Sequence, residues 1–152
     1  MRKLTLGLLA MGISFSAHAQ STNWRYQKTQ DAFTDVQRSY AETQLGGHSL
    51  LAVMCQSDVV TVVTKTDYLD IEFGDVRQVT WRIDEHESVS QSWRNMPKGG
   101  ALIIGEEAAH LAGMLRDASS RFAIRSGPAV RQFGVKGSTS AISKVLADCG
   151  RQ

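Results

Sequence analysis

The stretch VTWRIDEHES, residues 79–88, carries the pattern that decides the fold. Successive side chains of a β-strand point to opposite faces of the sheet. An extended chain here puts apolar side chains on one face (Val79, Trp81 and Ile83) and polar side chains on the other (Thr80, Arg82 and Asp84). The acidic run DEHES that follows is short enough for a tight connection to a second strand. The stretch therefore predicts an antiparallel hairpin with one face in the core.

Eight short segments, the opening one among them, have strand character. They are rich in Val, Thr and aromatic residues, and Gly, Asp, Asn or Ser turns separate them, which is typical of antiparallel hairpins. The segments are residues 23–29, 36–43, 49–55, 59–64, 76–84, 89–93, 121–126 and 130–136.

Two segments have helical periodicity instead. In GEEAAHLAGMLRDAS, apolar residues recur at helical spacing and Glu106 and Glu107 fall in the first turn, where the helix dipole favours acids. In STSAISKVLADCG, an apolar stripe ends at Cys149, with Ser or Thr available as N-cap and Gly150 as the stop. The chain is therefore predicted to be an α+β domain, an antiparallel β-sheet or sandwich with two packed helices.

The chain has two cysteines, Cys55 and Cys149. An even count favours a disulfide in a chain that enters an oxidising compartment, and the N-terminal segment described next predicts such export. Cys55 is in phase with apolar residues of its strand and Cys149 belongs to the apolar stripe of the last helix, so the bridge would staple this helix onto the sheet. Closing a loop of about 90 residues between the two cysteines would stabilise the fold by roughly 4 to 5 kcal/mol in the chain-entropy model.

The N-terminal residues 1–19 have the features of a cleaved secretory signal peptide. Arg2 and Lys3 precede an apolar run, and small residues stand at Ala17 and Ala19. The apolar run is shorter than the roughly 18 residues of a membrane anchor. We therefore expect a single periplasmic domain over residues 20–152, with no integral membrane segment after cleavage.

Charge argues against a nucleic-acid partner. The basic excess of the whole chain comes from Arg2 and Lys3, and the remainder carries 15 basic and 15 acidic residues. A formally neutral chain lacks the basic footprint that nucleic-acid binding requires.

No standard catalytic, nucleotide-binding or metalloprotease signature occurs in the sequence. His86 lies in the acidic turn DEHE, which is interpreted as a solvated turn, with metal binding or acid–base chemistry as the alternative. His110 is interpreted as a helix-flank residue. We therefore expect no enzyme activity, no catalytic residues, no metal and no cofactor.

Arg82 and Asp84 are the strongest candidates for a binding element. They lie about 7 Å apart on one face of their strand, and they either form a surface salt bridge or hold a loop or an anionic ligand. On residues 121–126, Arg121 and Arg125 share the face opposite to Phe122 and Ile124. If the two strands lie in one sheet, Arg82, Arg121 and Arg125 form a basic patch with Asp84 as internal partner, suited to an anionic partner surface. A merely solvated face is the alternative.

Several short motifs together span nearly the whole chain after residue 20: NWRY, LLAVMC, VTWRID, SQSW, FAIRS, RQFGVKG and AISKVLADCG. Their order resembles that of the VasI/TagO family of type VI secretion-associated proteins. The family pattern of an aromatic-Arg-Ile-Asp string and a downstream Trp matches Trp81–Asp84 and Trp93. The resemblance implies a periplasmic, non-enzymatic accessory protein whose partner is an envelope or secretion-system protein.

Two other functional classes are compatible with the sequence. A secreted inhibitor of a cell-wall hydrolase could present a loop such as DEHES to a basic cleft. An envelope enzyme would need His86 or His110 beside a carboxylate in a cleft.

Overall fold

The computed structural model describes residues 23–46, 49–65, 75–96 and 99–151. Within these residues the chain forms nine strands and two helices. In chain order they are β1 (Arg25–Gln30), β2 (Gln37–Leu45), β3 (Ser49–Gln56), β4 (Val59–Lys65), β5 (Val76–Ile83), β6 (Val89–Met96), β7 (Gly100–Ile104), α1 (Glu106–Asp117), β8 (Arg121–Ser126), β9 (Ala129–Gly134) and α2 (Ser138–Asp148). The predicted signal peptide lies outside the described residues.

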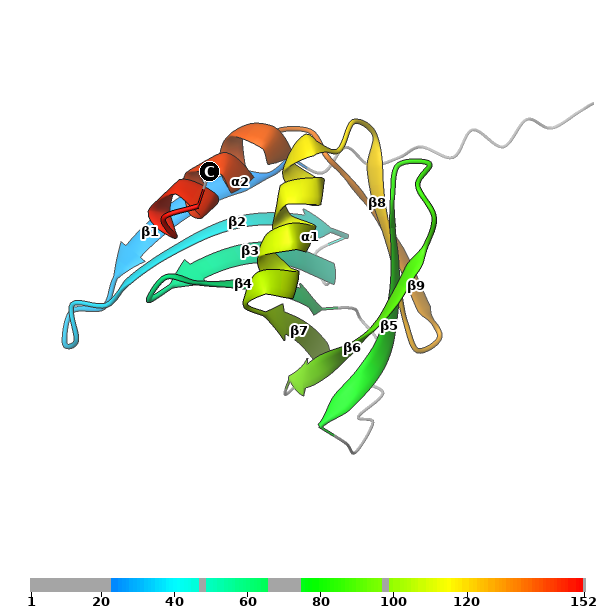
Figure 1. Cartoon of the computed structure of the whole chain (residues 1–152), viewed down its shortest axis with the longest axis horizontal. Helices are drawn as coiled ribbons and strands as arrows, with labels where there is room; N and C mark the ends of the chain where they lie inside the picture. The colour runs from blue at the N-terminus through cyan, green and yellow to red at the C-terminus, as the bar shows by residue number, and fades with distance from the viewer. Residues whose placement is uncertain (1–22, 47–48, 66–74, 97–98, 152) are drawn as a thin grey trace, which may run out of the picture.

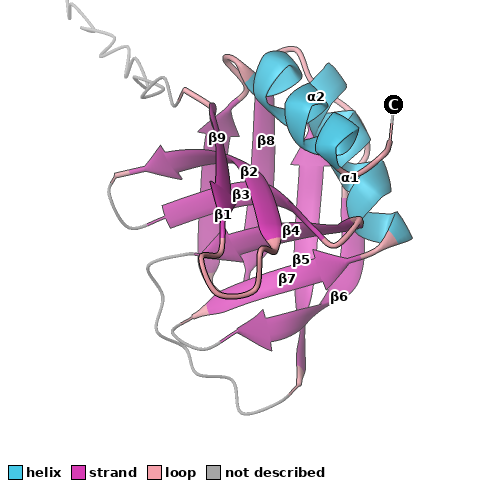
Figure 2. Cartoon of the chain, turned by 90° about the vertical axis from the view of Figure 1, so that its left-hand side faces the viewer, coloured by secondary structure: helices cyan, strands magenta, loops and turns pink. Residues whose placement is uncertain are grey.

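All nine strands belong to one antiparallel sheet in the order β1-β2-β3-β4-β7-β6-β5-β8-β9. The sheet curls until its two ends meet beside Trp24. The backbone N–H of Trp24 donates to the carbonyl of Lys136 at 3.0 Å, and its indole N–H donates to the carbonyl of Gly134 at 3.0 Å. Figure 2 shows β5 and β8 running crosswise to β3 and β4, so the two parts of the sheet face one another as in a sandwich.

Both helices cover the same side of the curled sheet (Figure 1). Helix α1 packs on β4 and β7, whereas α2 packs on β1, β2 and β3 and against α1. The predicted α+β class, an antiparallel sheet with two packed helices, is confirmed. None of the helices in the described ranges is long and apolar enough to span a membrane.

The core lies between the facing parts of the sheet and the two helices. The following residues, which alternation or helical spacing assigns to the core, are all buried: Leu51, Val53, Trp81, Ile83, Leu111, Leu115, Phe122, Ile124, Ile142 and Leu146. Trp93 and Phe133 are the largest further side chains that are fully buried. Removing this apolar area from water is the main force that holds the sheet and helices together.

The predicted disulfide joins Cys55 on β3 to Cys149, which directly follows α2, with a Cα–Cα distance of 5.7 Å. Both cysteines are buried. The bridge therefore staples the last helix onto the sheet, as expected.

Two local features differ from the sequence-based expectations. Strand β7, GALII, was not expected, yet it pairs with both β4 and β6 and joins the two parts of the sheet. Helix α2 begins after Gly137, whose φ of 84° is left-handed, and no side chain caps it. The predicted Ser or Thr N-cap is therefore wrong, whereas Gly150 follows the helix at a φ of 66°, as a C-terminal stop should.

Candidate functional site

Strands β5 and β8 bring the predicted arginines onto one surface. The two strands pair antiparallel, with Arg82 opposite Ala123 and Thr80 opposite Arg125. Because Trp81, Ile83, Phe122 and Ile124 point into the core, the alternate residues point outward. We call this surface the basic face; it comprises Thr80, Arg82, Arg121, Ala123 and Arg125. Arg125 is exposed, and Arg82 and Arg121 are partly so.

Glu85 pairs with two arginines of the basic face. Its carboxylate accepts from the guanidinium of Arg82 at 3.4 Å and from that of Arg121 at 2.5 Å. The Glu85 side chain is 79% exposed, and such surface pairs contribute about 0 to 1 kcal/mol. Glu85 thus holds two arginines in position on the surface and adds little to stability.

Asp84 does not pair with Arg82, so the expected internal partner of the patch is wrong. Strand β5 ends at Ile83, and Asp84 has a φ of 49°, which breaks the alternation of the strand. Its carboxylate instead accepts hydrogen bonds from three backbone N–H groups, those of Ser119, Ser120 and Arg121, and from both serine hydroxyls, all between 2.8 and 2.9 Å. Asp84 therefore fixes the chain that enters β8.

These hydrogen bonds set the acidity of Asp84. Partial burial by itself would raise the pKa of the carboxyl, but the hydrogen bonds from Ser119, Arg121 and Ser120 outweigh burial and hold the pKa well below its usual range. The group is therefore an anion throughout the physiological pH range.

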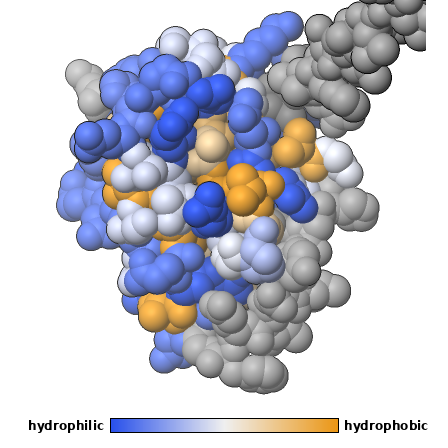
Figure 3. Space-filling view, turned by 90° about the vertical axis from the view of Figure 1, so that its right-hand side faces the viewer, coloured by the Kyte–Doolittle hydropathy of each residue, from blue (hydrophilic) through white to orange (hydrophobic). Residues whose placement is uncertain are grey.

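The basic face contains an open hollow of about 300 Å³. Figure 3 views the molecule from this side, and the described surface is mostly hydrophilic with separate hydrophobic spots. Arg82, Arg125, Ser88 and the exposed Val130 contribute to the lining. No carboxylate in the described parts of the chain pairs with Arg125, so its guanidinium is available to an anionic group.

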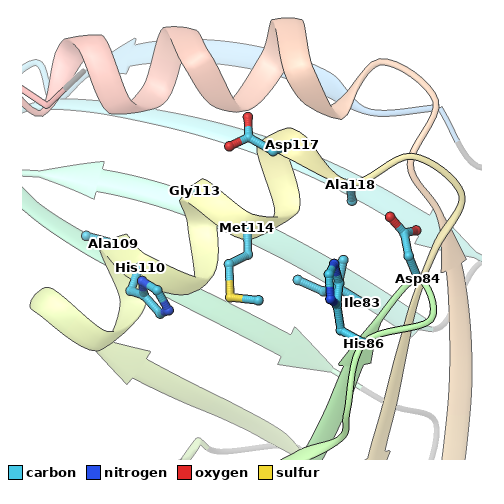
Figure 4. Close-up of a pocket in the computed structure, with 9 residues that line it drawn as sticks. All are labelled: Ile83, Asp84, His86, Ala109, His110, Gly113, Met114, Asp117 and Ala118. Carbon is cyan, nitrogen blue, oxygen red and sulfur yellow. The ribbon is translucent and has the colours of Figure 1, made fainter.

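A second cleft, of about 400 Å³, lies between α1 and the turn from β5 to β6. His110 and Met114 project into it from α1, and His86 approaches from the turn (Figure 4). Asp84 and Asp117 also line it. The structure therefore brings together the two histidines that the sequence singled out separately.

Neither aspartate of this cleft is placed to activate a histidine. The carboxylate of Asp84 is engaged by the start of β8, and that of Asp117 accepts from Arg116 at 2.8 Å. Among the described residues, no hydrogen bond joins His86 or His110 to a carboxylate. The same residues contain no group of three or more His, Cys, Asp and Glu side chains that could hold a metal ion.

Glu85 and Val130 are residues of this surface that sequence reasoning did not single out. Glu85 follows the last strand residue by two positions, and only a tight turn returns its side chain to Arg82. Asp tolerates positive φ better than most residues, so recognising Asp84 as a turn residue would have predicted that the strand alternation ends before Glu85.

Comparison of the chain with models of protein families, with curated proteins and with solved structures finds no match.

Proposed function

We propose that the chain is a periplasmic accessory protein that binds an acidic surface of an envelope or type VI secretion-machinery protein through its basic face. The observation that carries the proposal is the convergence of Arg82, Arg121 and Arg125 on one surface of two paired strands. Guanidinium groups recognise carboxylates with fixed bidentate geometry. Glu85 orders two of them in advance, which lowers the entropy lost on binding.

The cysteine bridge and the signal-like N-terminus support export of the chain, and the motif order of the VasI/TagO family supports the accessory role. A rigid sheet suits such a role because a partner then meets a preformed surface.

Site-specific crosslinking in the periplasm tests the proposal. A photo-crosslinking residue at Ala123, inside the hollow, should trap an envelope protein, and Arg125→Glu should abolish the adduct by reversing the charge. Arg82→Ala should weaken capture while changing the free energy of unfolding by less than about 0.5 kcal/mol. Arg38→Ala is the matched control, because Arg38 is exposed on a strand in the other part of the sheet.

If an arginine variant captures less of the envelope protein only because the variant is less stable, the basic face is a structural feature and not a binding surface. Equal capture by the Arg125→Glu variant would also refute the proposed site.

A second candidate function, inhibition of a cell-wall hydrolase, is favoured by the turn between β1 and β2. There Phe33 is 97% exposed, and one carboxylate oxygen of Asp31 accepts from the backbone N–H groups of Phe33 and Thr34 at 3.0 Å each. Asp35 stands on the other side of Phe33 and accepts from Gln30 at 3.1 Å. A rigid acidic turn with a projecting aromatic ring fits a basic cleft better than DEHES, whose Glu85 is already paired.

The inhibitor function predicts that the purified protein retains a soluble lysozyme and reduces its activity, and that Phe33→Ala loses both effects without a change in melting temperature. Undiminished lysozyme activity at a large excess of the protein would reject this candidate.

A further inference from the structure

We infer that the cleft between α1 and the β5–β6 turn binds a soft monovalent metal ion, Cu(I) in chemical class, through His86, His110 and Met114. All three side chains line this one cleft. In the view of Figure 4, the thioether of Met114 lies between the imidazole rings of His110 and His86. This inference is independent of the proposed partner-binding face.

The helix supplies two of the ligands at the spacing that a shared ion needs. Residues four apart on a helix are neighbours on one face, and His110 and Met114 have this spacing. The core-facing stripe of α1 is Ala108, Leu111, Ala112 and Leu115, so His110 and Met114 lie on the cleft side. The added Cβ of an alanine at Gly113, between them, would meet nothing within 4 Å, so the space beside the two ligands is open.

The third ligand comes from the turn that faces the helix. His86 is exposed, and its backbone N–H donates to the carbonyl of Ile83 at 3.0 Å, which fixes the turn but leaves the imidazole free to rotate. His110 is also exposed. Because neither ring is part of the core, a change of rotamer toward the sulfur of Met114 leaves the core packing unchanged.

The ligand set selects the class of metal. Thioether sulfur is a soft ligand that favours Cu(I), and imidazole also suits copper. Hard divalent ions and zinc gain from carboxylate ligands, but Asp84 is engaged by the start of β8 and Asp117 by Arg116. Three neutral ligands without an anionic one suit a singly charged ion.

Both cysteines of the chain are joined in a disulfide. No thiolate therefore competes with the His and Met ligands for a soft ion in the oxidised protein.

Silver tests the site, because Ag⁺ is a soft monovalent ion that stays in one oxidation state in air. Calorimetry of the oxidised mature protein with silver nitrate, in buffer free of chloride and thiols, should show one ion bound per chain. In protein with ¹³C-labelled methionine methyl groups, the Met114 signal should shift on binding, while those of Met54 and Met96 stay in place.

The variants separate the three ligands. Met114→Leu, which nearly conserves volume, and His110→Asn and His86→Ala on exposed positions should each lower the Ag⁺ affinity at least tenfold. Met54→Leu is the control and should leave the affinity unchanged. Zn²⁺ should bind more weakly than Ag⁺ to the unaltered protein.

Three results would overturn the inference: no Ag⁺ binding at a stoichiometric concentration, a shift in the signal of a different methionine, or wild-type affinity in Met114→Leu. Circular dichroism of each variant establishes that a lost affinity does not come from a lost fold.

Discussion

One carboxylate oxygen of Asp84 accepts two hydrogen bonds from Ser120, one from its backbone N–H and one from its hydroxyl, each at 2.8 Å. With the bonds from Ser119 and Arg121, this arrangement joins the end of β5 to the start of β8. The basic face depends on that junction, because Arg82 and Arg121 are carried by these two strands.

Replacing Asp84 with Asn should lower the free energy of unfolding by about 2 kcal/mol, because an amide oxygen is a weaker acceptor than a carboxylate and the amide NH₂ faces donors. Because the folded pKa is depressed, the stabilisation is present above the unfolded pKa of about 3.9 and is lost as the pH falls below it. Urea denaturation at pH 7 and pH 3 measures this. An equal difference in stability between the wild-type protein and the Asp84→Asn variant at both pH values would contradict the assignment.

The disulfide should contribute several kcal/mol. Cys149→Ser removes the covalent link between α2 and β3 and also places a hydroxyl in a buried position. The free energy of unfolding should therefore fall further in this variant than it does when the disulfide of the unaltered chain is reduced. Mass spectrometry of the exported protein under non-reducing conditions should find the two residues linked. Free thiols after export would refute the bridge.

The sequence was most informative where the backbone is regular. Alternation in β5 and β8 predicted both the buried residues and the outward arginines, because a two-residue period is unbroken in an extended chain. The same rule failed at Asp84, since the period ends where φ becomes positive. Strand β7 was missed because it is short and begins with Gly100, and its pairing with β4 and β6 is a long-range property that local pattern does not carry. The cleft that joins His86 to His110 likewise depends on how α1 packs, which neither local segment encodes.

Two buried tryptophans provide a matched comparison. The indole N–H of Trp81 donates to the side-chain oxygen of Gln91 at 2.8 Å, whereas that of Trp93 has no acceptor in the described parts of the chain. Trp81→Phe removes a satisfied donor and leaves Gln91 unpaired, but Trp93→Phe removes an unsatisfied one. We therefore expect Trp81→Phe to cost about 1 kcal/mol more than Trp93→Phe. Thermal unfolding of both variants measures the difference, and the reverse order would contradict the assigned hydrogen bonds. Trp81→Ala should cost about 3 to 5 kcal/mol.

Tyr26 and Asp148 link β1 to α2 and make the fold sensitive to alkaline pH. The hydroxyl of Tyr26 donates to the carboxylate of Asp148 at 2.6 Å, and this bond, followed by burial and the charge of Asp148, raises the pKa of Tyr26 to about 12. Because the folded pKa lies above the unfolded value of about 10, the bond stabilises the protein fully below pH 10. Its contribution falls as the pH rises toward 12.

The difference in ultraviolet absorbance between the wild-type protein and Tyr26→Phe, followed during an alkaline titration, isolates the Tyr26 hydroxyl. In Asp148→Asn the midpoint should move toward about 10, and Tyr26→Phe should cost about 1 kcal/mol at roughly pH 8. A Tyr26 midpoint near 10 in the wild-type protein would show that the hydrogen bond to Asp148 does not hold in solution.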